Sequence, residues 1–209
     1  MSRPSEVALV SDEDTQVGGA IAHALRAAGV DVRTEVDAAP DGLDLAVYSR
    51  VARAAFPARP LVTVDEQGWI DGAEQPVRDF VAWMKAVYQP LARRRGTVVL
   101  IAPTASQEGA AGLVPYTAAV EGQRLLAKSV ARQWAERGIT VLTVAPRLDA
   151  VVDVDAIGAT DATRTDPSLG ADSYEPDAVA RVVLMLRDPS ARVLTGTTVP
   201  VDGGALLAP

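Results

Sequence analysis

The sequence predicts an α/β protein with a doubly wound, mainly parallel sheet of about six strands, covered by helices on both faces. Two runs, Thr97–Ile101 and Ile139–Val144, are short, β-branched and not alternating, as strands buried on both faces must be. A long helical pattern separates them, and Gly138 follows its last turn, where a left-handed residue is favoured. A strand–helix–strand crossover of this kind joins parallel neighbours in one sheet.

The remaining strands follow from similar apolar runs. A helix with Val17, Ile21 and Leu25 on one stripe should follow the first strand, and Gly29 should end it. The strands expected outside the central crossover are Val7–Val10, Val30–Val36, Leu45–Tyr48 and Val193–Val201.

Three further helices are predicted from periods of three and four residues: Glu74–Arg95, Tyr116–Arg137 and Pro176–Leu186. The second should bury a stripe of Ala119, Leu126, Val130 and Trp134. The segments 51–68 and 147–173 read as loop, because Pro, Gly, Asp and Thr dominate them. The predicted helix Glu74–Arg95 should bury Phe80, Val81, Met84, Val87, Tyr88 and Leu91.

Composition narrows the possible functions. The 209 residues suit a single domain, 1–209, and the net charge of −7 opposes binding to nucleic acid or to an anionic membrane. With no cysteine, disulfides and zinc–thiolate sites are excluded. No signal-like or membrane-spanning apolar run is present, so we expect a cytoplasmic protein.

The segment from Gly96 to Pro146 resembles the core of the classical short-chain dehydrogenases/reductases, as does VDGG at 201–204. The resemblance implies a Rossmann-like fold, a nicotinamide cofactor and a catalytic Ser, Tyr and Lys. Tyr116 stands where the family has its Tyr, but Val120 replaces the Lys and Pro103 replaces the Ser. Arg147 replaces the Gly that follows the second strand of the core.

The turn after the first strand also departs from the family, whose glycines let the backbone approach the dinucleotide pyrophosphate. Here Asp12 and Gln16 replace the first two glycines, and only Gly18 matches, at the position that usually allows close helix–sheet packing. Asp12, Glu13 and Asp14 place three carboxylates where phosphates would lie, with a repulsion of roughly 3 kcal/mol per pair at about 5 Å and an effective dielectric of about 20. Alternatively, these residues only favour a helix N-terminus. We expect no NAD(P) binding, and no cofactor-binding residue is assigned.

Residues 37–44 leave room for only a short link to the third strand, so about one βα unit of the family should be missing beyond Val30–Val36. The chain also contains no Asn, and the family's Asn-based motifs therefore cannot exist in it.

The candidate catalytic residues are Tyr116, as a vestige of the family's acid, and the nearby hydroxyls of Thr104 and Ser106. An unassisted Tyr is a poor acid–base catalyst at neutral pH, and Lys128 lies about 18 Å further along the helix. The alternative is a buried Tyr that only hydrogen-bonds to one of these hydroxyls.

Other polar residues carry weaker signals. His23 has no acidic partner that can be identified from the sequence, so a surface or packing role is expected. Asp149, Asp153 and Asp155 could suggest a hard-metal site, but their spacing lacks the other parts of a calcium loop. A solvated acidic loop is the expectation, with no metal.

Three functions remain open. The first is a degenerate, non-catalytic family member that acts as an assembly partner or binding scaffold. The second is a cofactor-independent enzyme that reuses the Tyr116 pocket, and the third is an NAD(P)-dependent oxidoreductase with atypical motifs. The expected partners are a second copy or an active homologue, through helices 74–95 and 116–137, and a small-molecule ligand is compatible with this. The alternative is that these helices only cover the sheet.

Overall fold

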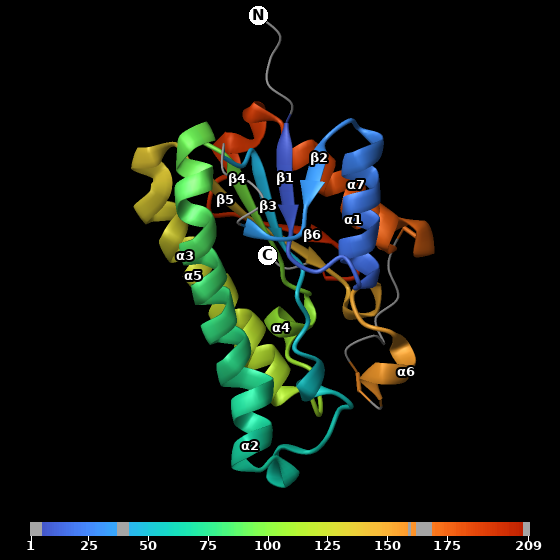
Figure 1. The fold of residues 1–209 in the computed structure, drawn as a ribbon. Coiled ribbons are helices and arrows are strands. Elements are labelled where there is room, and N and C mark those ends of the chain that lie inside the picture. The colour runs from blue at the N-terminus through green and yellow to red at the C-terminus, as the bar shows by residue number, and fades with distance from the viewer. Residues whose placement is uncertain (1–5, 37–41, 159, 162–168, 207–209) are drawn as a thin grey trace, which may run out of the picture.

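The computed structural model describes residues 6–36, 42–158, 160–161 and 169–206. Its centre is one sheet of six parallel strands in the order β2-β1-β3-β4-β5-β6 (Figure 1). The predicted doubly wound α/β fold is confirmed. The strands are β1 Val7–Val10, β2 Asp31–Arg33, β3 Leu45–Tyr48, β4 Thr97–Ile101, β5 Thr140–Pro146 and β6 Thr198–Val201.

Helices cover both faces of this sheet. Helices α1 (Gln16–Ala27) and α7 (Pro176–Leu186) pack together on one face, and α3 (Gln75–Arg94) and α5 (Val114–Trp134) lie on the other (Figure 1). β3, β4 and β5 are buried along their whole length, which explains why their sequences are mostly apolar and do not alternate with charged residues.

The sheet ends at β2 within the described residues, and no strand lies outside it there. This agrees with the missing βα unit, although residues 37–41 of the short link lie outside the described part of the chain. Two predicted strands are shorter than expected: Val30–Val36 contributes only Asp31–Arg33, and the last strand begins at Thr198. Residues Pro189–Leu194 form a 3-10 helix instead. Asp188 caps the start of this helix, because its carboxylate accepts a hydrogen bond from the Ser190 amide.

The continuous helix that ends with α3 begins earlier than the predicted Glu74. Helix α2 (Glu66–Trp69) and a π-helical turn (Ile70–Glu74) lead directly into α3. Asp65 caps the start, because its carboxylate accepts from the Gly68 amide at 2.8 Å. Gly72 permits the close packing that follows, since a Cβ there would lie 2.9 Å from Pro115 Cβ. The start of this continuous helix extends well past the carboxyl ends of the strands (Figure 1).

Helix α5 presents a different face to the sheet from the predicted one. Leu126, Val130 and Trp134 are only half-buried, and Trp134 packs on Tyr88 of α3 with ring centroids 5.0 Å apart. Three alanines, Ala119, Ala127 and Ala131, lie on the buried face and let the helix approach the sheet closely, whereas Leu126, Val130 and Trp134 lie on its flank. The buried residues of α5 are Pro115, Tyr116, Ala119, Val120, Gln123, Arg124, Ala127 and Ala131.

The remaining short helices lie near the carboxyl ends of the strands. Helix α4 (Ala105–Glu108) follows β4, and α6 (Val154–Ile157) lies in the segment predicted as loop. No helix in the described part of the chain is long and apolar enough to cross a membrane.

Candidate functional site

The candidate site lies at the carboxyl ends of β1, β3, β4 and β5, where ligands bind in open parallel sheets. Tyr116, from the first turn of α5, is buried there and packs on Phe56, with ring centroids 5.0 Å apart. Its surroundings withdraw the phenol from water, and this burial raises the pKa of Tyr116 above its usual value of 10. A catalytic tyrosine of this family needs the opposite shift, which a neighbouring ammonium group would supply.

Neither lysine of the chain supplies that charge. Lys85 and Lys128 are both exposed, on α3 and α5 respectively, and Val120 fills the position one turn after Tyr116. The cavity beside Tyr116 measures about 90 Å³. Small-molecule sites usually measure about 300–1,000 Å³, so this cavity is too small for a nicotinamide and a substrate together. Its lining includes Tyr48, Arg50, Asp79, Ile101 and Val120.

Tyr48 lines the same cavity and lies between two aromatic rings of α3. Its ring is 4.9 Å from that of Phe80 and 5.0 Å from that of Trp83. Burial is the main reason why the pKa of Tyr48 rises to about 12. Both phenols of the cavity are therefore neutral at physiological pH.

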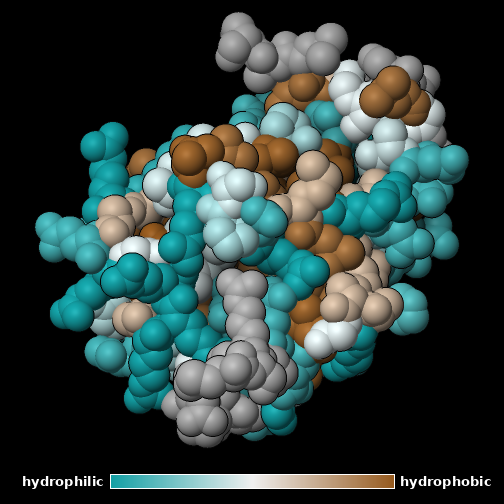
Figure 2. Space-filling model, turned by 90° about the horizontal axis from the view of Figure 1, so that it is seen from above, coloured by the Kyte–Doolittle hydropathy of each residue, from teal (hydrophilic) through white to brown (hydrophobic). Residues whose placement is uncertain are grey.

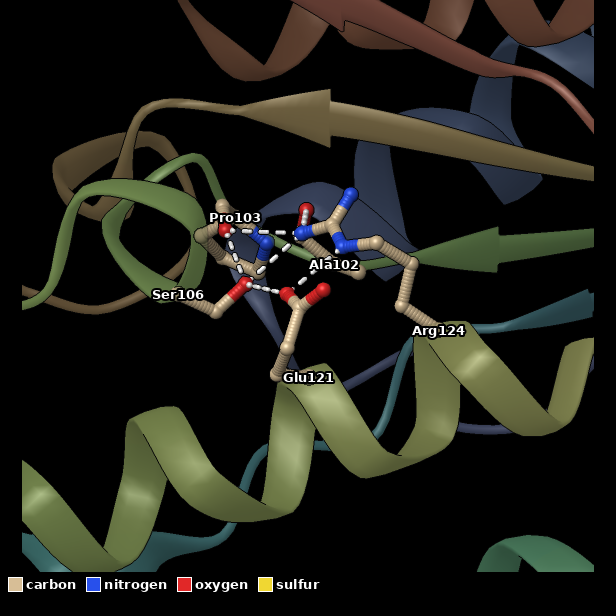
Figure 3. Close-up of polar contacts among 5 residues, drawn as sticks. All are labelled: Ala102, Pro103, Ser106, Glu121 and Arg124. Carbon is tan, nitrogen blue, oxygen red and sulfur yellow. Dashed lines mark hydrogen bonds and ion pairs between the residues drawn. The ribbon is translucent and has the colours of Figure 1, made fainter.

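The hydroxyl of Ser106 points to different partners from those the sequence suggested. It donates to the Pro103 carbonyl at 3.0 Å and to the Glu121 carboxylate at 3.2 Å, and it accepts from Arg124 at 2.7 Å (Figure 3). Thr104 is buried beside it and donates its backbone amide to the Pro146 carbonyl at 2.8 Å. The structure records no hydrogen bond between Tyr116 and either residue among those described. A catalytic role for these three residues stays a prediction.

Arg124 is the polar residue of this region that sequence reasoning missed. Its side chain is 1% exposed, and its guanidinium donates to Glu121, Ser106 and the carbonyls of Ala102 and Pro103 at the end of β4. Its remaining nitrogen, Nη1, has no recorded partner and points away from Ser106 and Glu121 (Figure 3). A helical period that assigns charged residues to the solvent face cannot find it. The one feature of the sequence that could have indicated a buried Arg124 is its position about two turns after Tyr116, on the same side of the helix.

Hydrogen bonds hold the turn after β1 in a closed conformation. Thr15 caps α1, and its hydroxyl accepts from the Gly18 amide at 3.0 Å. That hydroxyl and the hydroxyl of Ser49 both donate to the Asp12 carbonyl. A Cβ at Gly18 would lie 1.8 Å from the Asp12 carbonyl oxygen, so this glycine lets the turn fold against the helix rather than only the helix against the sheet.

The three acidic residues of the turn are arranged more favourably than their sequence suggests. Glu13 forms a two-pronged ion pair with Arg26, at 2.8 and 2.9 Å, which offsets part of the expected repulsion. Asp12 accepts from the Asp14 amide, and Asp14 is exposed. These contacts agree with the alternative that acidic residues favour a helix N-terminus.

The residues after β5 form a second closed cluster. Arg147, only 6% exposed, makes a two-pronged ion pair with Asp149 at 2.9 and 3.0 Å and lies over the ring of Tyr174 at 4.6 Å. The pKa of the neighbouring Glu108 is raised, first by partial burial of this otherwise exposed side chain and then by the charge of Asp202. Asp202 itself is buried and accepts from the amides of Gly204 and Leu206, which accounts for its place in the VDGG segment.

The other residues considered as catalytic or metal-ligating candidates are exposed or bonded to neighbouring residues. His23 is exposed on α1. Asp153 caps α6 by accepting from the Asp155 amide at 2.9 Å, and Asp149 is paired with Arg147. The described residues contain no cluster of acidic or histidine side chains that could hold a metal ion.

A nicotinamide dinucleotide, which the resemblance implies, does not fit these residues. Asp12 and Gln16 replace the two glycines that would let the backbone approach the pyrophosphate, and the Gly18 amide is taken by the Thr15 hydroxyl. The space beside Gly18 holds the Asp12 carbonyl, and carboxylates surround the turn.

Comparisons with known proteins agree with the fold. A family model described as "Enoyl-(Acyl carrier protein) reductase" matches residues 30–205. The chain belongs to the short-chain dehydrogenase/reductase family. A solved structure described as an oxidoreductase of this family, from Burkholderia thailandensis, superposes with a TM-score of 0.77 at 20% identity, covering 99% of this chain and 94% of the other.

Several curated relatives are described as 3-oxoacyl-(acyl-carrier-protein) reductases. A 3-oxoacyl-(acyl-carrier-protein) reductase of Vibrio cholerae is 32% identical over 146 residues, 69% of this chain and 60% of the relative. The corresponding reductase of Staphylococcus aureus is 31% identical over 147 residues, again 69% of this chain and 59% of its own length. The chain thus matches about three-fifths of the length of these relatives.

Proposed function

We propose that this chain is a non-catalytic member of its family that acts as an assembly partner or binding scaffold. The observation that carries the proposal is the closed turn at the N-terminus of α1. In a dinucleotide-binding turn the backbone amides are left for phosphate. Here Asp12 and Gln16 replace the two glycines that let the backbone approach a phosphate, and the Thr15 hydroxyl occupies the Gly18 amide.

The surroundings of Tyr116 support the same proposal. The phenol is buried, its pKa is raised, and Val120 stands at the position of the family's lysine. The serine position holds Pro103, and the nearest serine, Ser106, is bonded to Glu121 and Arg124. Loss at one position could be compensated, but here the phosphate turn and the proton-transfer residues have changed together.

The experiment is a direct titration of the purified chain with NADPH and with NADH, followed by calorimetry and by cofactor fluorescence. The Vibrio cholerae reductase, one of the curated relatives, serves as the positive control under the same conditions. We expect no saturable binding to this chain below millimolar concentration. Micromolar affinity for either cofactor would contradict the proposal and favour an oxidoreductase with atypical motifs.

The assembly part of the proposal rests on the outer surface of α3 and α5. Leu125 is 65% exposed on α5, and the half-buried Leu126 and Val130 lie on the same helix. Apolar surface of this kind is costly to hydrate, and a two-fold contact between copies would remove it from water.

A further inference from the structure

A second hollow lies at the opposite end of the sheet, where the strands begin. It measures about 690 Å³, within the range of ligand sites. The residues of its rim come from the start of β1, the end of α3, the start of β4 and the segment after α7. Figure 2 looks onto this end of the molecule, where hydrophilic side chains surround a band of hydrophobic ones.

The charged lining of this hollow consists of four arginines and three carboxylates. Two of the arginines are engaged, since Arg94 pairs with Asp44 at 2.7 Å and Arg187 pairs with Glu6. Asp44 is further fixed, because it also accepts from the Val7 amide at 2.8 Å. These pairs belong to the framework that joins β1, α3 and α7.

Arg95 and Arg192 are the other two arginines. Arg192 donates to the backbone carbonyl of Arg95, so that the chain after α7 is tied to the end of α3. No ion pair to either guanidinium is recorded among the residues that the structure describes. The pKa of the remaining carboxylate, Asp188, is lowered first by a hydrogen bond with the Ser190 side chain and then by the bond that it accepts from the Ser190 amide. This carboxylate is therefore ionised and opposes an anion at that side of the hollow.

The backbone of Arg95 is unusual. Within the described residues it is the one non-glycine residue with a positive φ, 55°, a conformation that is unfavourable for an L-residue with a side chain. A helix usually places glycine at such a C-terminal position. The stem of Arg95 lies against Gly138, where a Cβ would be 3.1 Å from Arg95 Cδ, so a second glycine leaves room for this side chain.

We propose that this hollow binds a multiply charged oxyanion, a phosphate ester or polyphosphate, through the guanidinium groups of Arg95 and Arg192. Arginine suits such a ligand because its planar fork matches phosphate oxygens in pairs. The site is separate from the carboxyl ends of the strands, and it does not depend on whether the family's cofactor site works. It also lies in a chain whose overall charge of −7 repels anions, so binding must come from the local arginines.

The test is a calorimetric titration of the full chain with inorganic tripolyphosphate at low salt. We expect saturable binding with one site per chain, weakened at least tenfold in Arg192→Ala and in Arg95→Gly. The matched control is Arg78→Ala, which should change the affinity less than twofold. Arg78 is exposed in the first turn of α3, whereas the hollow lies at the end of that helix.

The Arg95→Gly variant separates binding from folding. Glycine adopts a φ of 55° freely, so the melting temperature should stay close to that of the wild type while binding is lost. No saturable binding to the wild type, or equal binding by the wild type and both arginine variants, would overturn the proposal.

Discussion

Arg124 shows how one buried charge can organise the region where a catalytic centre would lie. Its guanidinium holds the end of β4 through two backbone carbonyls and joins them to Ser106 and Glu121. Glu121 is half-exposed, so the carboxylate stays hydrated if Arg124 is removed. The cost of removal should then come from lost packing and lost hydrogen bonds rather than from a buried, unpaired carboxylate.

We predict that Arg124→Ala lowers the free energy of unfolding by about 2–4 kcal/mol. Arg124→Met should lose less than half as much, because methionine refills the volume and removes the unpartnered Nη1. Urea unfolding of the two variants and the wild type measures both values. Equal losses in the two variants would show that the hydrogen bonds, not the packing, supply the stability.

The two buried phenols make stability sensitive to alkaline pH. Above about pH 10 the unfolded chain releases their protons while the folded chain keeps them, so the free energy of unfolding should fall as pH rises. The fall reaches about 1.4 kcal/mol per pH unit for each phenol. Tyr116→Phe should therefore lose stability less steeply than the wild type in urea unfolding between pH 9 and about pH 11.

Tyr48→Phe provides the comparison for this experiment. It should show the same reduced slope up to about pH 12, the pKa to which burial raises Tyr48. A wild-type slope that neither substitution changes would contradict the raised pKa values. Ionisation of Tyr116 near neutral pH, seen as phenolate absorbance that Tyr116→Phe removes, would instead support a catalytic tyrosine.

At the scale of elements, the proposed loss of dinucleotide binding rests on the turn between β1 and α1. Its closure depends on the absence of a side chain at Gly18, because a Cβ would overlap the Asp12 carbonyl oxygen at 1.8 Å. Gly122, in the middle of α5, is in the opposite situation: its added Cβ would meet only Val77, at 3.6 Å.

We predict opposite effects for the two alanine substitutions. Gly18→Ala should destabilise the fold by more than about 2 kcal/mol, since backbone atoms must move. Gly122→Ala should stabilise it by about 0.5–1 kcal/mol, because alanine loses less conformational freedom in a helix interior. Thermal unfolding measures both changes. A neutral Gly18→Ala would mean that the turn is open in solution and that phosphate could enter it.

At the scale of the whole molecule, the proposed assembly is tested at α5. We expect the purified chain to form a dimer or tetramer at micromolar concentration in light scattering, because apolar surface around Leu125 then leaves water. Leu125→Arg should give a monomer, because a charge would be placed in the contact. The matched control is Met185→Arg, at a residue of α7 that is 70% exposed on the other face of the sheet.

A monomeric wild type would contradict self-assembly, and co-expression with an active homologue would then test the heteromeric form of the proposal. A dimer that persists equally in Leu125→Arg and Met185→Arg would show that copies meet elsewhere. Neither result depends on cofactor binding, so assembly and loss of catalysis are tested separately.

The sequence by itself determined the parallel sheet, because buried strands need nearly all-apolar, non-alternating runs. The chain has such runs at Val7–Val10, Leu45–Tyr48, Thr97–Ile101 and Ile139–Val144. It also determined which residues stand at the family's catalytic and phosphate-binding positions. Only the tertiary structure decided what those residues contact. Thr15 caps the turn, Arg124 turns inward and Arg95 lines a hollow, since each depends on atoms distant in the chain or on backbone geometry. Local periodicity describes a helix's own faces, whereas neighbouring elements decide which of those faces is buried.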